Sequence, residues 1–68
     1  MEFKIIGHEF ITLQSLLKAA GLCDSGGAAK VAVTSGQVKV DGETEIRRGK
    51  KIRAGQVVQF AGKEIRVV

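Results

Sequence analysis

The sequence has few of the residues that staple a small fold or carry out chemistry. Its 68 residues include one cysteine and one histidine, and they include no tryptophan, tyrosine or proline. A single cysteine cannot close an internal disulfide, and one cysteine with one histidine cannot complete a tetrahedral zinc site. A chain of this length buries only about 60% of the surface that it exposes when unfolded. We therefore expect aliphatic side chains to hold the fold together, and we expect no metal or cofactor.

Catalysis is excluded on the same grounds. No pair of titratable residues is spaced for acid–base or nucleophilic chemistry, and His8-Glu9 lacks the second histidine of a metalloprotease helix. We predict that His8 lies on the surface, that Cys23 is simply packed, and that the protein is not an enzyme.

The sequence also lacks the usual signals for export and for membrane insertion. Residues 1–4 hold no basic segment followed by an apolar run, and no stretch approaches the roughly 18 apolar residues of a membrane span. A lone cysteine fits a reducing compartment. We expect a cytoplasmic protein of bacterial or organellar type, without a membrane partner.

Positive charge, by contrast, is concentrated in the last third of the chain. Residues 1–46 hold four basic and six acidic side chains, a net charge of −2, whereas residues 47–68 hold seven basic and one acidic, a net charge of +6. Five cations lie within Arg47–Arg53, and no acidic residue occurs between Glu45 and Glu64. A merely solvated loop usually mixes charges, so we interpret Arg47–Arg53 as an exposed loop that contacts the phosphates of a polyanion.

Two short helices are predicted from the spacing of apolar residues and from the residues that cap the helix ends. The first has apolar residues at the spacing of one helical face behind the N-cap Thr12, with Gln14 and Lys18 on the outer face. The second has Ser25 as its N-cap and ends at Gly36. The apolar residues of the two helices are Leu13, Leu16, Leu17, Ala20, Ala28, Ala29, Val31, Ala32 and Val33.

Two hairpins are predicted after the helices. Val38 and Val40 alternate with polar residues, and Asp41-Gly42 is a strong signal for a two-residue hairpin turn. A terminal hairpin is expected from residues 57–60 and 64–67.

A further strand is expected at residues 2–6, ended by Gly7. The order of elements predicts an α+β fold in which two packed helices are followed by a small antiparallel sheet. We expect residues 1–68 to form a single domain.

The scarcity of aromatic residues narrows the type of nucleic-acid binding. We expect Phe3, Phe10 and Phe60 to lie in the core, so no exposed aromatic ring remains for stacking on single-stranded bases. Recognition of structured RNA through its phosphates and shape is the better fit, although duplex DNA offers the same phosphates.

A second candidate anion site is Ser25-Gly26-Gly27, at the start of the second helix. The N–H groups of a helix N-terminus attract anions, and glycine lets a phosphate approach closely. The residues equally fit a simple helix cap, and they are not a P-loop because no Gly-Lys-Ser or Gly-Lys-Thr follows the glycines. Lys30 is expected to extend the basic surface from this helix.

These elements resemble the alpha-L RNA-binding family, first seen in small-subunit ribosomal protein four. In that family a leucine-bearing helix leads to a second helix that starts Ser-Arg-x-x-Ala, and the turn Gly-x-Val-x-Val-Asn-Gly follows. Over about residues 11–60 the matching residues are Leu16, Leu17, Ser25, Ala29, Gly36, Val38, Val40 and Gly42. Gly26 stands where the family has arginine, and Asp41 where it has asparagine. We expect Lys30 and the Arg47–Lys51 run to replace the arginine's phosphate contact.

The resemblance implies a non-catalytic RNA-binding module, similar to a stand-alone bacterial branch of the family and working near the ribosome. We predict a monomer that binds structured RNA, either ribosomal or transfer RNA. The predicted RNA-binding residues are Lys18, Ser25, Gly26, Gly27, Lys30, Arg47, Arg48, Lys50, Lys51 and Arg53. The alternatives are a protein-interaction module that places the basic loop on an acidic partner, and a duplex-DNA binder.

Overall fold

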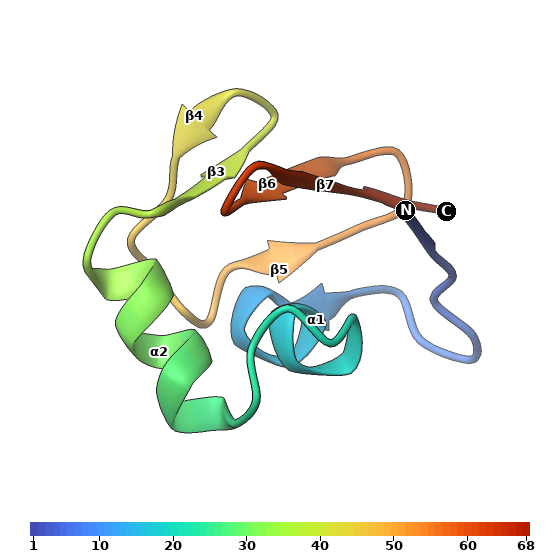
Figure 1. The fold of residues 1–68 in the computed structure, drawn as a ribbon. Helices are drawn as coiled ribbons and strands as arrows, with labels where there is room; N and C mark the ends of the chain where they lie inside the picture. Colours follow the sequence, from blue (N-terminus) through green and yellow to red (C-terminus); the bar gives the residue numbers. More distant parts are fainter.

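Two short helices lie beneath a five-stranded sheet in the computed structural model, which describes residues 1–68 (Figure 1). The elements are β1 (Glu2–Phe3), β2 (Ile11–Thr12), α1 (Leu13–Ala19), α2 (Gly26–Thr34), β3 (Val38–Val40), β4 (Glu43–Thr44), β5 (Lys51–Ile52), β6 (Val57–Phe60) and β7 (Lys63–Val67). The predicted α+β class is confirmed.

Both helices begin and end where their sequences indicate. The hydroxyl of Thr12 accepts a hydrogen bond of 3.3 Å from the N–H of Ser15, and the hydroxyl of Ser25 accepts one of 3.1 Å from the N–H of Ala28. These caps satisfy N–H groups that have no partner within the first turn of a helix. Gly36 follows α2 at φ 80°, a left-handed conformation that glycine adopts without strain.

The main sheet is built largely from the two predicted hairpins, in the strand order β1-β7-β6-β3-β4. Asp41 and Gly42 join β3 to β4 with φ values of 52° and 85°, which suit the right-handed twist of a tight hairpin. The strands place alternate residues on the helices, and Val38, Val58 and Ile65 are fully buried there.

The first strand departs from the prediction. The strand is limited to Glu2–Phe3, and it runs parallel to β7, with Glu2 opposite Arg66. The predicted antiparallel sheet therefore has one parallel edge. The sequence shows no sign of this pairing because it joins the two ends of the chain.

A second, two-stranded sheet was not predicted. Residues Ile11–Thr12 and Lys51–Ile52 pair antiparallel, with Ile11 opposite Ile52. The interpretation of Arg47–Arg53 as one loop is thus wrong for its second half. The side chain of Ile52 is fully buried and fixes this half of the segment to the core.

The core contains only apolar side chains. Its 13 buried residues are Leu13, Leu16, Leu17, Cys23, Ala29, Ala32, Val33, Val38, Val40, Ile52, Val58, Ile65 and Val67. Phe3 and Phe60 are half-buried against this cluster, but Phe10 is not part of it, which corrects the prediction for Phe10. Cys23 is packed as expected, and burial, followed by the charge of Asp24, raises the pKa of its thiol.

Candidate nucleic-acid interface

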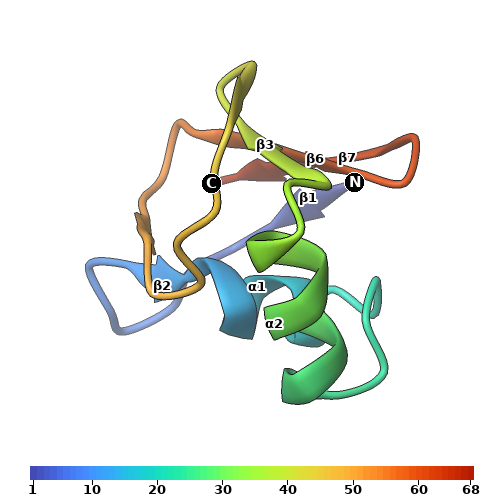
Figure 2. The same cartoon turned by 90° about the vertical axis from the view of Figure 1, so that its left-hand side faces the viewer.

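The basic loop, which is the part of Arg47–Arg53 that precedes β5, is fixed through its backbone to the start of α1. The carbonyl oxygens of Lys50 and Arg48 accept hydrogen bonds of 2.8 and 3.0 Å from the N–H groups of Leu13 and Gln14. Figure 2 shows the segment before β5 descending to the junction of β2 and α1. Because the carbonyls point at the helix, the loop has a fixed backbone, and the side chains of Arg48 and Arg47 are left exposed to solvent.

Gln14 also connects the loop to the start of α2. Its side-chain Nε2 donates a hydrogen bond of 2.9 Å to the carbonyl of Gly26. The sequence placed Gln14 on the outer face of α1, but its side chain is half-buried between the helices. A Cβ added at Gly26 would lie 3.0 Å from that Nε2. Gln14 therefore links the two predicted anion sites, through Arg48 in the basic loop and Gly26 at the start of α2.

A basic hollow, defined by Arg47, Gly49, Lys50, Lys51 and Arg53, opens beside the loop. Its volume is about 540 Å³, and no carboxylate lines it. Cations that surround one hollow repel one another and raise the local concentration of a polyanion. Four of the five predicted cations meet here, whereas Arg48 lies outside the lining.

Lys51 and Arg53 share an aromatic neighbour. The Nζ of Lys51 lies 5.0 Å from the centroid of the Phe10 ring, and the Cζ of Arg53 lies 5.7 Å from it. Both distances fall within the range of a cation–π interaction. Sequence reasoning missed Phe10 because its neighbours across the strand pair are about 40 residues away.

Arg47 is held by Glu45, the acidic residue that immediately precedes the stretch without acidic side chains. Its Nε and Nη2 donate hydrogen bonds of 3.0 and 3.1 Å to the two carboxylate oxygens of Glu45, and its backbone N–H donates another of 3.0 Å. The Arg47 side chain is 72% exposed and that of Glu45 only 13%. These hydrogen bonds lower the pKa of Glu45 to about 2 and raise the pKa of Arg47. One edge of the guanidinium is thus occupied and the other faces solvent.

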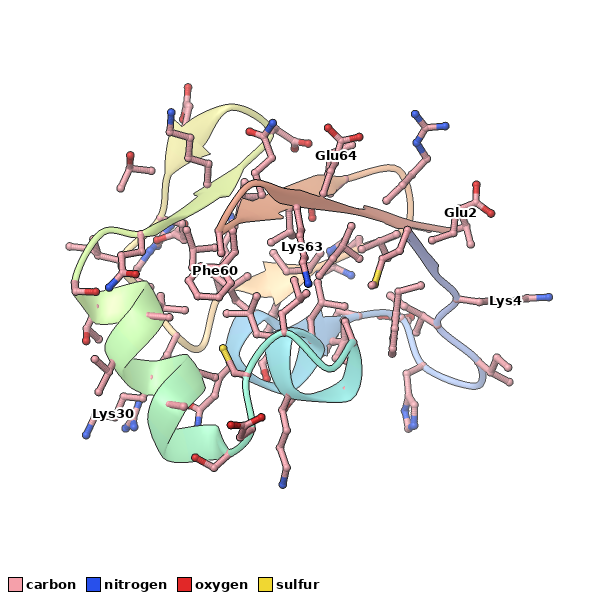
Figure 3. All side chains as sticks on the ribbon, viewed as in Figure 1. Glu2, Lys4, Lys30, Phe60, Lys63 and Glu64 are labelled. Carbon is pink, nitrogen blue, oxygen red and sulfur yellow. The ribbon has the colours of Figure 1, made fainter.

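The remaining predicted residues lie outside the hollow. Lys18 and Lys30 are exposed on α1 and α2, and Figure 3 shows Lys30 projecting away from the sheet. Gly27 is exposed, and only the hydroxyl of Ser25 lies within 4 Å of a Cβ built on it, at 3.8 Å. No hydrogen bond joins these residues to the basic loop directly, and the connection runs through Gln14 to the adjoining Gly26.

The sequence of almost the whole chain matches a known family. Residues 3–68 match the S4 domain. The chain belongs to the S4 domain family. It is 48% identical over 66 residues to YbcJ of Escherichia coli, a match that covers 97% of this chain and 94% of YbcJ.

Two further comparisons agree with this assignment. The "Probable ribosome maturation protein RlbA" of Bacillus subtilis is 42% identical over 57 residues, which cover 84% of this chain and 80% of RlbA. The solution structure of YbcJ, described as revealing an alpha-L motif involved in RNA binding, superposes with a TM-score of 0.76 over 98% of this chain and 85% of that one. The resemblance to the stand-alone branch of the family is confirmed.

These relatives point to a non-enzymatic protein, as the sequence predicted. Neither helix is long and apolar enough to cross a membrane.

Proposed function

We propose that this protein binds structured RNA, chiefly through phosphate groups. The observation that carries the proposal is the basic hollow, in which Arg47, Lys50, Lys51 and Arg53 surround one opening without a carboxylate in its lining. A ring of cations gains free energy when it neutralises phosphates, because the nucleic acid then releases its condensed counterions. The alpha-L motif described for YbcJ supports RNA as the polyanion.

The proposed contact surface continues past Gln14 to the start of α2. The hydroxyl and carbonyl of Ser25 accept from the N–H groups of Ala28 and Ala29, so the N–H groups of Gly26 and Gly27 remain for an incoming phosphate. We assign Lys18, Lys30 and Arg48 to the edges of this surface, where they add charge. Gly26 replaces the family arginine, and the cations of the hollow take over its contact.

Phosphates and shape, rather than bases, carry the recognition in this proposal. The chain has no tryptophan or tyrosine, and its three phenylalanines are half-buried. Single-strand binders stack bases on exposed rings, and this chain offers no such platform. A folded RNA, which presents closely spaced phosphates across its grooves, fits a rigid basic hollow.

The name of RlbA supports a role close to the ribosome. We propose that the target is ribosomal or transfer RNA, that residues 1–68 act as one RNA-binding domain in the cytoplasm, and that the protein binds as a monomer.

A competition experiment tests the proposal. Fluorescence anisotropy would compare a folded ribosomal RNA fragment, transfer RNA, duplex DNA of equal charge and an acidic protein at one salt concentration. The proposal expects the folded RNAs to bind most tightly, and crosslinking in cells to recover ribosomal or transfer RNA. Tighter binding of the acidic protein or of duplex DNA would assign the basic hollow to one of the two alternative partners.

A further inference from the structure

Phe10 occupies a position where a solvated side chain would be expected. In the pairing of β2 with β5, Ile11 lies opposite Ile52, and both of these face the core or pack against it. Since neighbouring residues of a strand point to opposite faces, Phe10 belongs to the outer face of this ladder. An aromatic ring there gains little from the core.

The same alternation sets both cations beside the ring. Lys51 and Arg53 flank the buried Ile52, so they lie on the face opposite to it. Continuing the β2–β5 register by one residue places Phe10 across from Arg53. The ring centroid lies 5.0 Å from the Lys51 ammonium and 5.7 Å from the Arg53 guanidinium carbon. Both of these cations line the basic hollow, and Phe10 does not.

We propose that Phe10 is a positioning residue for the basic hollow, because it holds Lys51 and Arg53 over its ring before RNA arrives. Long cationic side chains lose rotamer freedom when they bind a phosphate, and a contact formed on folding removes part of that loss from the binding step. The atoms near the ring are the charged ends themselves, Nζ of Lys51 and Cζ of Arg53, and a phosphate would bind them from the side away from the ring. This inference rests on the proposed function and names a residue that the sequence assigned to the core.

The test compares variants of Phe10 with a matched control. Phe10→Leu keeps an apolar side chain but removes the ring, and it should weaken binding of a folded RNA by about three- to tenfold, given the strength of exposed cation–π pairs. Phe10→Tyr keeps the ring and should bind as the wild type does. Phe60→Leu makes the same change at a half-buried ring without a cation over it, and it should leave affinity unchanged after correction for the folded fraction.

Salt dependence separates positioning from direct contact. Phe10→Leu should keep the wild-type slope of log affinity against log salt, because the number of neutralised phosphates is unchanged. Lys51→Gln should reduce the slope by about 0.7 to 0.9. In a protein that already carries Lys51→Gln and Arg53→Gln, the further change Phe10→Leu should have no effect, since the side chains that it positions are gone.

Measurements on the wild-type protein keep the test independent of the stability of any variant. Ring currents should move the NMR resonances of the Lys51 and Arg53 side chains upfield of those of Lys63 and Arg66. Wild-type affinity in Phe10→Leu, or an equal loss in the background without the two cations, overturns the positioning role. If Lys51→Gln and Arg53→Gln leave RNA binding intact, the proposed function fails at this hollow instead.

Discussion

The side-chain amide of Gln14 donates a 2.9 Å hydrogen bond to the carbonyl of Gly26, across the gap between the two helices. The backbone N–H of the same glutamine donates to the carbonyl of Arg48. One residue near the start of α1 thus fixes the relative position of the start of α2 and the basic loop. Two of the predicted RNA-binding residues, Gly26 and Arg48, are brought together by this link although they lie far apart in the sequence.

Replacing this glutamine should affect binding more than folding. Gln14→Met keeps the length of the side chain but removes the donor, so stability should fall by about 1 kcal/mol. RNA affinity should fall further than the loss of folded protein explains, because the loop and α2 are no longer held together. Urea unfolding and an RNA titration on the same samples check this. Gln59→Met, on an exposed position of β6, is the control, and equal effects of the two substitutions would remove the linking role of Gln14.

Gly27 should tolerate substitution in the free protein but not in the complex. Gly27→Asp places a carboxylate at the N-terminus of α2, where negative charge is favourable for the helix, and the exposed site has room for it. The melting temperature should stay the same or rise, while RNA affinity falls through repulsion of phosphate. Gly27→Asn is the uncharged control. Undiminished RNA affinity in a folded Gly27→Asp variant would reduce Ser25-Gly26-Gly27 to a helix cap.

Leu17 should matter for folding alone. Its side chain is fully buried in the core, and Leu17→Ala should cost about 2 to 5 kcal/mol from lost burial and the cavity left behind. A domain this small has little stability beyond that, so RNA binding should disappear along with the folded protein. Val31→Ala, at a side chain that is 62% exposed, should change neither property. A stable, folded Leu17→Ala variant would show that the core has been misassigned.

Acid should weaken the fold through Glu45. The hydrogen bonds from Arg47 lower the pKa of this carboxyl from an ordinary value of 4.5 to about 2. A carboxyl whose pKa is lower in the folded state stabilises the protein above its ordinary pKa, and that stabilisation is lost as the pH falls from about 4.5 towards 2. The N–H of Val57 and the side-chain amide of Gln56 donate hydrogen bonds to the carboxylate of Asp41, which lowers the pKa of Asp41 and acts in the same direction.

Glu45→Gln should therefore lower stability at neutral pH and make it depend less on pH in this acid range. Urea unfolding at pH 7 and pH 3 would measure both effects. Glu64→Gln is the control, because it removes an exposed carboxylate without a side-chain hydrogen bond. This variant should lose as much stability in acid as the wild type does. An unchanged pH dependence in Glu45→Gln would mean that the pair with Arg47 does not persist in solution.

Much of the fold follows from local features of the sequence. The caps Thr12 and Ser25 and the turn Asp41-Gly42 each act within a few residues, and all three occur where predicted. The β2–β5 pair escaped prediction because strands of two residues show no periodicity, and the partners are about 40 positions apart.

The candidate site could be predicted in its composition but not in its arrangement. The run of cations was visible in the sequence, and four of its members do line one hollow. The ion pair of Arg47 with Glu45 and the placement of Phe10 depend on side-chain directions that only the folded backbone determines. The prediction that Gln14 lies on the outer face of α1 was wrong for the same reason. A residue at the edge of that face can still contact the neighbouring helix, as the side chain of Gln14 does at Gly26.

The most direct test of the phosphate-binding hollow is the salt dependence of RNA affinity in the variant Lys50→Gln/Lys51→Gln/Arg53→Gln. Arg47 is left in place because its removal would break the pair with Glu45, and the melting temperature of the variant should stay close to that of the wild type. If about four phosphates are bound, the wild type should lose roughly two orders of magnitude in affinity between 50 and 200 mM salt.

The variant should bind weakly and have a salt slope smaller by about two to three. A control variant, Lys4→Gln/Lys63→Gln/Arg66→Gln, makes the same change in charge at exposed positions outside the hollow and should keep most of the affinity and the slope. If instead the hollow variant is folded and binds RNA with the affinity and slope of the wild type, the RNA does not bind through this hollow.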